Sequence, residues 1–461
     1  MSRQRATWND QHASTGKKHL PKNSTPLYLR LALVAISLVP LQQAFTINIG
    51  SPLKPSELLM AGSIVLWLFS SRKKKSPAEF KLIIALLAIL LLSALFHLAA
   101  RTPLGDFLGY SRSPDGDLIF YTIYPIFVLF MWRVASEVPH EMFQKAIKLS
   151  IWVCFAGVAF QLAMMQMDRV DILELFSYET KIRSESLTGS GEGAMRNGTF
   201  TEGQHLGFFS AISVLVAWRC RAYLTLSVAL FTLAYSQSTT GIVGLVLVVF
   251  LLVLMRPSTR AAIKIGMGLA ASVITVLLVD SLRNLIILQA AKLGLAAGSH
   301  QIEGATASIE VRSLKTEIAW RMMWDNPILG VGPGRFGFWY FKDPASIDSP
   351  FWYFLPDRRT IAENAYMQIG SELGVIALLV FIAFMWSLLK RVRRNDKTLL
   401  GVFFLIALGI ASQSSWTFIP IWIFSAFIIS GTYESDPDVD PALVGINQGM
   451  IADPRKPNSV D

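Results

Sequence analysis

The chain has 461 residues, of which 52% are hydrophobic and only 16% are charged, and its mean hydropathy is +0.46. Soluble domains carry roughly 25% charged residues, so this composition excludes an ordinary soluble globular protein. The net charge of +10 does not indicate nucleic-acid binding, because the lysines and arginines gather in short segments between apolar runs, as in the cytoplasmic loops of membrane proteins.

The N-terminal segment, residues 1–26, is polar throughout, which predicts a disordered cytoplasmic tail rather than a cleavable signal peptide. About twelve apolar runs follow, several of them close to the roughly 20 residues that cross a bilayer. The predicted fold class is therefore an all-α polytopic membrane protein with about 12 transmembrane helices. We expect the spans near residues 27–45, 57–70, 79–100, 118–134, 145–166, 204–218, 222–236, 240–255, 261–280, 365–389, 398–413 and 415–430.

The basic residues test this count, because short loops rich in lysine and arginine face the cytoplasm. With the N-terminus inside, every basic cluster in a short loop falls on the inner side, from residues 72–75 to residues 390–397. Residues 431–461 return to that side as a second cytoplasmic tail. The pattern therefore predicts that both termini are cytoplasmic.

The spans divide into an N-terminal bundle of about nine helices, residues 27–280, and about three C-terminal spans, residues 365–430. One long outer loop, residues 281–364, separates them. A polar loop of that length in a compact bundle is usually functional. No internal repeat is evident, which weakens an inverted-repeat transporter hypothesis. Cys154 and Cys220 lie in apolar runs, so they read as buried thiols without a disulfide or metal pattern.

Within the long loop, ASIEVRSLKTEIAWRMMWDNP (307–327) predicts an amphipathic helix. Its apolar residues share one face at helical spacing: Val311, Leu314, Ile318 and Met322. Arg312 and Lys315 line another face. We expect the helix to lie on the membrane surface with this basic face toward lipid phosphates.

The next stretch, GVGPGRFGFWY (330–340), has the Gly-x-Gly-x-x-Gly spacing of a dinucleotide-binding loop at Gly332, Gly334 and Gly337. It follows a predicted helix rather than a strand, and Pro333 lacks the backbone N–H that a phosphate cradle would use. We therefore expect the glycines to form a tight turn where the chain re-enters the membrane, not a nucleotide site.

The predicted helix, the glycine turn and the following ENAYMQIGSELG (363–374) together resemble the O-antigen ligase and polymerase superfamily of bacterial envelope glycosyltransferases. Its members have about a dozen helices and a large periplasmic loop, in which an arginine-bearing helix leads into a D-x-P-hydrophobic-x-G-x-G stretch, here residues 325–332. RNGTFTEGQHLG (196–207) resembles the family's stretch before a mid-chain span. The resemblance covers roughly residues 190–390.

The resemblance implies transfer of a sugar from an undecaprenyl-diphosphate carrier to an acceptor hydroxyl at the periplasmic face of the bacterial inner membrane. It implies no metal and no cofactor. The expected partners are the undecaprenyl-diphosphate-linked glycan, membrane lipid, and the chain-length regulator and flippase of the same pathway. Nucleic acid is not expected.

Such a reaction needs cations that stabilise a leaving diphosphate and a base that accepts the acceptor's proton. Arginine binds phosphate oxygens bidentately, and we predict this role for Arg312, Arg321, Arg335 and Arg196. Glu363, at the re-entry point, is the predicted catalytic base. The predicted substrate-binding residues are Glu202, His205, Asn364, Tyr340 and Trp352.

Each of these residues also has a purely structural interpretation. The arginines could be interfacial anchors or solvated charges. Glu202 and His205 could cap a helix, and Glu363 could be a favourable acid at a helix N-terminus. Tyr340 and Trp352 could stack on sugar or anchor the loop at the interface, where such side chains gather.

Ligases of this superfamily carry a histidine where Glu363 stands, and many members carry an arginine where this chain has Thr239. The missing histidine favours a polymerase that joins lipid-linked repeat units of an O-antigen or exopolysaccharide. The alternative is a ligase that moves finished polysaccharide to lipid A core. A transporter or flippase of lipid-linked sugar is a third hypothesis. It would place charges inside several spans, whereas the clear interior candidates here are few, His97 and Glu372 among them, and charge lies in the outer loops.

Overall fold

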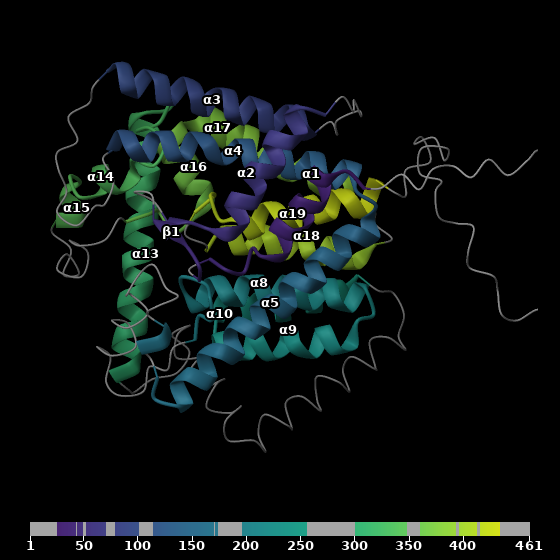
Figure 1. Ribbon diagram of the computed structural model, residues 1–461. Helices are drawn as coiled ribbons and strands as arrows, with labels where there is room; N and C mark the ends of the chain where they lie inside the picture. The colour runs from purple at the N-terminus through teal and green to yellow at the C-terminus, as the bar shows by residue number, and fades with distance from the viewer. Residues whose placement is uncertain are drawn as a thin grey trace, which may run out of the picture.

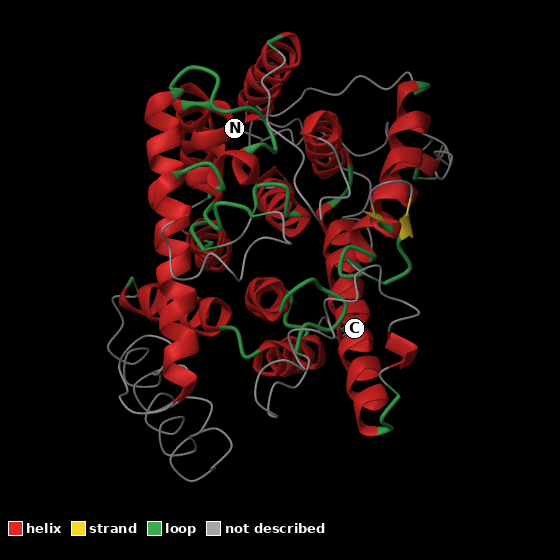
Figure 2. Cartoon of the chain, turned by 90° about the vertical axis from the view of Figure 1, so that its left-hand side faces the viewer, coloured by secondary structure: helices red, strands yellow, loops and turns green. Residues whose placement is uncertain are grey.

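The computed structural model describes residues 25–42, 44–48, 52–70, 79–100, 114–169, 171–173, 196–255, 300–347, 360–392, 396–412 and 415–433. These residues form a bundle of helices, and one long helix, α13 (His300–Asp325), lies across the bundle's end (Figure 1). Figure 2 shows several bundle helices nearly end-on and α13 along its length.

The bundle brings together helices that are consecutive in the chain and helices that are far apart in it. Its first half comprises α1 (Leu27–Ser37), α2 (Pro55–Leu68), α3 (Glu79–Ala99), α4 (Pro114–Glu137) and α5 (His140–Gln166). A short antiparallel pair, β1 (Ile47–Asn48) and β2 (Pro52–Leu53), precedes α2 and is the one departure from the all-α prediction among the described residues. The middle of the chain forms α8 (Gly203–Arg219), α9 (Tyr223–Ser236) and α10 (Thr239–Leu254).

The second half follows α13. Two short helices, α14 (Phe336–Tyr340) and α15 (Pro344–Ile347), lie beside it. The chain then returns to the bundle as α16 (Ala365–Leu373), α17 (Val375–Arg391), α18 (Lys397–Ile410) and α19 (Ile419–Tyr433). Of the predicted spans, the one at residues 261–280 lies outside the described residues.

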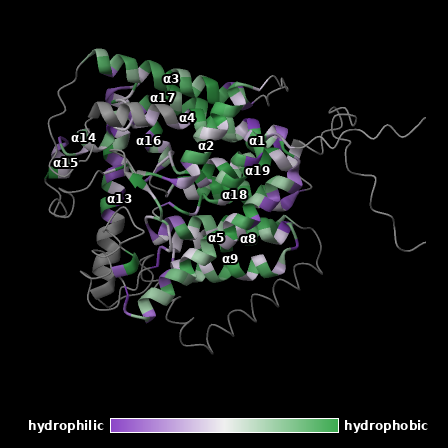
Figure 3. Cartoon of the chain, viewed as in Figure 1, coloured by the Kyte–Doolittle hydropathy of each residue, from purple (hydrophilic) through white to green (hydrophobic). Residues whose placement is uncertain are grey.

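Most helices of the bundle consist largely of apolar residues (Figure 3). In the described part of the chain, α3 and α5 are long and apolar enough to cross a membrane, and six shorter apolar helices accompany them. Hydrophobic residues dominate the bundle helices, and hydrophilic ones gather toward helix ends and on α13 (Figure 3). Large apolar side chains also point outward, among them Leu95 of α3, which is 64% exposed, and Phe250 of α10, which is 50% exposed. Such surfaces suit lipid rather than water, which supports a membrane protein.

Three ion pairs lie at the end of the bundle opposite α13. Arg133 pairs with Glu137 within α4 at 2.5 Å, whereas Arg219 with Asp396 at 3.1 Å and Arg391 with Glu79 at 2.7 Å join different helices. Glu79 begins α3, whose other end contacts the segment after α13 through His97. The structure therefore brings these predicted inner-loop arginines to one end, although which side of a membrane that end faces stays a prediction.

The predicted span at residues 365–389 is two helices rather than one. Gly374 separates α16 from α17 with a φ of +88°. A Cβ on Gly374 would lie 2.6 Å from the carbonyl oxygens of Pro327 and Ile328, so only glycine permits this close approach. Val375 N donates a hydrogen bond to Pro327 O at 2.8 Å. Pro327 and Ile328, which follow α13, thus pack against the chain where α16 ends and α17 begins.

Candidate active site

The glycine stretch forms the predicted tight turn. Gly330, Gly332 and Gly334 have φ values of +63°, +103° and +71°, which side-chain-bearing residues adopt at a cost. The turn is bound to the end of α16, because Val331 N donates to Ser371 O at 2.8 Å and Gly332 N donates to Glu372 O at 3.0 Å. These N–H groups are occupied by protein carbonyls, which argues against a nucleotide phosphate at this loop.

The end of α3 closes the other side of the turn. Ser93 Oγ donates to Leu329 O at 2.7 Å, and His97 Nε2 lies 3.1 Å from Gly330 O. A Cβ on Gly330 would lie 2.2 Å from the carbonyl carbon of Glu372. His97, one of the few interior polar residues noted in the sequence, therefore contributes to holding the turn.

Glu363 is placed by the start of α16. The next residue, Asn364, is the N-cap: its Oδ1 accepts from Tyr366 N at 3.1 Å and Met367 N at 3.2 Å. Glu363 itself has a φ of +52°, a left-handed conformation that costs a non-glycine residue on the order of 1–2 kcal/mol. Such strain persists where the surrounding structure imposes it, and it gathers at functional sites.

Two cations on α13 hold the Glu363 carboxylate. Arg312 Nε lies 2.8 Å from Glu363 Oε2, and Lys315 Nζ lies 2.5 Å from Glu363 Oε1. Arg312 and Lys315 are three residues apart, so they project from the same side of the helix. The side chain of Lys315 is only 7% exposed. The expectation that Lys315 faces lipid phosphates was therefore wrong: it points inward because Glu363 is its counter-ion.

The apolar face of α13 behaves as predicted. Ile318 is fully buried and Met322 is 6% exposed in a small cluster that also holds Phe336 and Tyr340. Leu314 packs against the same cluster. This second core, separate from that of the bundle, fixes the rotation of α13 about its axis. It thereby turns Arg312 and Lys315 toward Glu363.

The start of α8 completes this cluster. Arg312 Nη2 donates to Gln204 Oε1 at 2.8 Å, and Gln204 Nε2 donates to Ser412 O. The neighbouring His205 is 8% exposed, and its ring stacks on Phe418 with centroids 4.6 Å apart. The structure thus joins Arg312, on the long loop, to the mid-chain segment that the sequence resemblance had singled out.

His205 lies close to the charged groups of the cluster. Those that act on its ring are Glu202, Lys54, Glu363 and Arg312. Glu202 is the N-cap residue of α8, but its side chain makes no capping hydrogen bond and is exposed. The charge of Glu363, the predicted base, thus acts on the ring of His205, a predicted substrate-binding residue.

The other three predicted arginines have described contacts with residues other than Glu363. Arg321 pairs with Asp343 at 3.2 Å, and nine helical residues place it about 14 Å from Arg312 along the axis and on the opposite side. Arg335 is buried, at 2% exposed, and its Cδ would be 2.8 Å from a Cβ on Gly332. Arg196 covers the first residue of α8, and its Nη1 lies 3.5 Å from Gln237 Oε1.

The two aromatic residues predicted to bind sugar are Tyr340 and Trp352. Tyr340 is fully buried, and its ring packs against Phe336 and Phe341. Burial first, and then the negative charges of Glu363 and Asp343, raise the pKa of Tyr340 to about 12. A ring enclosed in this way has no open face for a sugar in this structure. Trp352 lies outside the described residues.

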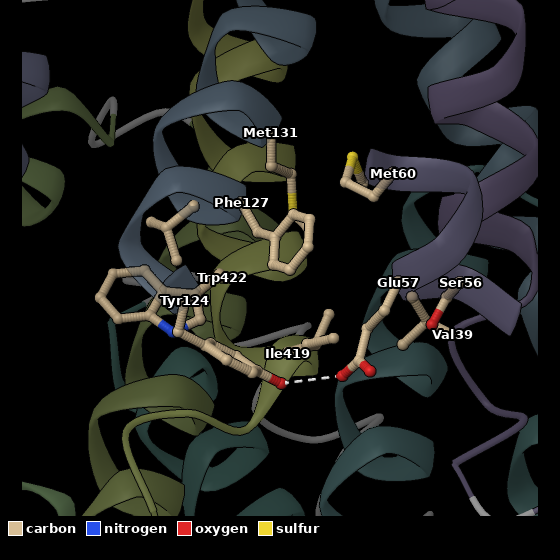
Figure 4. A pocket seen from close by; sticks show the side chains of 10 residues that line it. Val39, Ser56, Glu57, Met60, Tyr124, Phe127, Met131, Ile419 and Trp422 are labelled. Atoms are coloured by element: carbon tan, nitrogen blue, oxygen red, sulfur yellow. Dashed lines mark hydrogen bonds between the residues drawn. The ribbon is translucent and has the colours of Figure 1, made fainter. Parts of the chain in front are cut away.

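A separate small cavity lies inside the bundle (Figure 4). Its volume is about 20 Å³, enough for roughly one water molecule and too small for a sugar. Tyr124 Oη donates to Glu57 Oε1 at 3.4 Å across it, and Glu57 pairs with Lys54 at 3.2 Å. The cavity is lined by Val39, Ser56, Glu57, Met60, Tyr124, Phe127, Val128, Met131, Ile419 and Trp422, none of which is a predicted site residue.

The candidate site thus joins Arg312 and Lys315 of α13 to Glu363, before α16, and to Gln204, at the start of α8. Residues 224–382 match the family model described as O-antigen ligase. This segment is therefore similar to the O-antigen ligase and polymerase superfamily. The matched segment covers about a third of the chain and contains Arg312, Lys315 and Glu363, so the resemblance predicted from the motifs is confirmed. No curated protein matched the chain.

Two residues of the cluster were missed as site residues. Lys315 had a signal, since its spacing from Arg312 puts both cations on one side of the predicted helix. Gln204 had none, because its contact with Arg312 joins segments 108 residues apart. Proximity of that kind comes from the packing of α13 across the bundle.

Proposed function

We propose that the chain is a polymerase that joins undecaprenyl-diphosphate-linked oligosaccharide repeat units of an O-antigen or exopolysaccharide at the periplasmic face of the inner membrane. The superfamily match supports a glycosyltransferase-type enzyme. The observation that carries the proposal is the cluster in which Arg312 and Lys315 hold Glu363 where α13 crosses the bundle. It contains both the cations and the carboxylate that sugar transfer from a diphosphate needs.

In the proposed reaction, the acceptor hydroxyl attacks the anomeric carbon of the donor sugar. The bond from that carbon to the diphosphate oxygen breaks, and the diphosphate leaves with the electron pair. Arg312 stabilises the developing negative charge, and Glu363 accepts the hydroxyl proton. We propose that His205 and Glu202, at the start of α8, contact the sugars, since the charges of Glu363 and Arg312 act on the His205 ring.

The membrane setting follows from the same arrangement. The donor's lipid tail needs an apolar environment, which the exposed apolar faces of the bundle helices indicate. The diphosphate lies at the polar boundary, where α13 crosses the helix ends (Figure 1). We propose that this end is periplasmic, because the inner-loop arginines lie at the other end.

A ligase that transfers finished polysaccharide to lipid A core is the second candidate, and the description of the matching family favours it. Against it stands Glu363, in the position where ligases of the superfamily carry a histidine. The two reactions use the same donor chemistry, so the cluster accommodates either. They differ in the acceptor and therefore in what accumulates when the enzyme is absent.

Deletion of the gene in its host, followed by mass spectrometry of the lipid-linked glycans, tests the proposal. A polymerase predicts accumulation of single repeat units on undecaprenyl diphosphate. A ligase predicts accumulation of long polymer on the same carrier, with none on lipid A. If the repeat units instead stay on the cytoplasmic side, out of reach of an externally added glycosidase, the chain is a flippase and the transferase proposal fails.

A further inference from the structure

We propose that Arg312 and Lys315 form a phosphate-binding pair that Glu363 occupies in the unliganded protein, and that the donor's diphosphate displaces Glu363 and frees it to act as the base. The inference rests on the proposed function, because it states how the same site changes when the lipid-linked donor binds. Its new elements are the binding role of Lys315 and the exchange of one anion for another.

The geometry shows that Glu363 is not available as a base in this state. Each carboxylate oxygen accepts a hydrogen bond from a different cation: Oε2 from Arg312 at 2.8 Å and Oε1 from Lys315 at 2.5 Å. With both oxygens in contact with a cation, neither faces an acceptor hydroxyl. For Glu363 to accept a proton efficiently, both cations need another anion.

The exposures of the two cations indicate an order of events. The side chain of Arg312 is 41% exposed, whereas that of Lys315 is 7% exposed. An incoming diphosphate therefore meets Arg312 first. A buried ammonium is strongly destabilising unless it is paired, so Lys315 needs an anion at all times. The carboxylate provides it before the donor binds, and a phosphate oxygen provides it afterwards.

The charges fit the exchange. Arg312 and Lys315 carry two positive charges and Glu363 carries one negative charge. Before the donor binds, these three groups together therefore have one positive charge in excess. A diphosphate that links a sugar to a lipid carries two negative charges. It satisfies both cations and places a dianion beside the released carboxylate, which favours proton uptake by that carboxylate.

The step balances. The acceptor O–H bond breaks and its proton goes to Glu363, while the acceptor oxygen forms the new bond to the anomeric carbon. The bond between that carbon and the diphosphate oxygen breaks, and the electron pair stays on the leaving diphosphate. Its extra negative charge is stabilised by Arg312 and Lys315. When the product leaves, Glu363 gives its proton to solvent and pairs with the two cations again.

Binding of undecaprenyl diphosphate tests the exchange, because this probe carries no sugar and does not react. The full-length protein is placed in phosphatidylcholine nanodiscs, which lack anionic headgroups, and Kd is measured by microscale thermophoresis with and without sodium pyrophosphate as a soluble competitor. Glu363→Gln removes the competing charge and keeps the side-chain size. We expect this variant to bind the probe about tenfold more tightly than the wild type does. The reason is that the probe then no longer competes with the carboxylate for its two charge-assisted hydrogen bonds.

Two further variants give an independent measure. Lys315→Met should weaken probe binding about tenfold or more, and Lys315→Arg should restore most of that loss because it returns the charge. Glu317→Gln is the matched control: it removes one carboxylate from α13, where the Glu317 side chain is 67% exposed, and Kd should stay within about twofold. Pyrophosphate should displace the probe from the wild type.

Equal or weaker probe binding by Glu363→Gln overturns the exchange, since it means that the carboxylate only holds the cations in place. So does unchanged binding by Lys315→Met. Transfer activity separates this failure from that of the proposed function. If Glu363→Gln binds no more tightly but has lost transfer, the exchange is wrong and the transferase stands. If Glu363→Gln transfers sugar at the wild-type rate, the proposed base and the exchange both fail.

Discussion

Replacing Arg312 by lysine separates a catalytic role from a structural one. The guanidinium makes two directional contacts at once, from Nε to Glu363 at 2.8 Å and from Nη2 to Gln204 at 2.8 Å. One ammonium group keeps the charge but cannot reproduce both contacts. The loss of one charge-assisted hydrogen bond at a site 41% open to solvent should lower stability by about 1 kcal/mol.

The effect on activity should be much larger. A bidentate contact that strengthens as the diphosphate leaves is worth about 2–4 kcal/mol in the transition state, or about 30- to 1000-fold in rate. Initial rates of sugar transfer in nanodiscs and thermal melting of the same samples measure the two effects side by side. Arg321→Lys gives a comparison within the same helix: Arg321 has a nearly equal exposure of 42% but pairs with Asp343 instead of Glu363, so we expect a smaller loss of rate. A folded Arg312→Lys variant with the wild-type rate would show that Arg312 is only an anchor.

The turn, the helix cap and the topology give three more predictions. Gly330→Ala should prevent stable folding, since its Cβ would lie 2.2 Å from the Glu372 carbonyl carbon at a φ of +63°, whereas Gly62→Ala, with open space around it, should melt at or above the wild-type temperature. Asn364→Ala should cost about 1 kcal/mol of stability through loss of the α16 cap, and Asn364→Ser should restore it; a folded, inactive Ser variant would instead indicate substrate binding. In intact cells, an impermeant thiol reagent should label Glu317→Cys but not Lys390→Cys, both exposed positions; labelling of both would refute the topology.

The sequence predicted the helices better than their contacts. Hydrophobic run lengths located most of the described apolar helices within about five residues, because apolar length determines where a chain can cross a membrane; α1, however, ends at Ser37, well before the predicted end at residue 45. The glycine turn was predicted because positive φ leaves a signal in residue type. The break at Gly374 was missed, since a continuous apolar run does not reveal that another segment will pack against its backbone.

The candidate site was only partly predictable. The sequence singled out Arg312 and Glu363, and the structure places them in contact, but their ion pair follows from how α13 crosses the bundle. Lys315 was placed on a lipid-facing surface because helical spacing gives a face without saying what covers it. Tyr340 was a candidate for stacking because residue type does not reveal burial.

Reconstituted sugar transfer by Glu363→Gln tests the central claim most directly. Wild-type and variant proteins in nanodiscs are given undecaprenyl-diphosphate-linked repeat units from the host, and the products are separated by length on gels and identified by mass spectrometry. Glu317→Gln serves as the charge-matched control. The account predicts that wild type and Glu317→Gln extend the glycan and release undecaprenyl diphosphate, whereas folded Glu363→Gln leaves single repeat units unchanged. Full-length polymer from Glu363→Gln would contradict it.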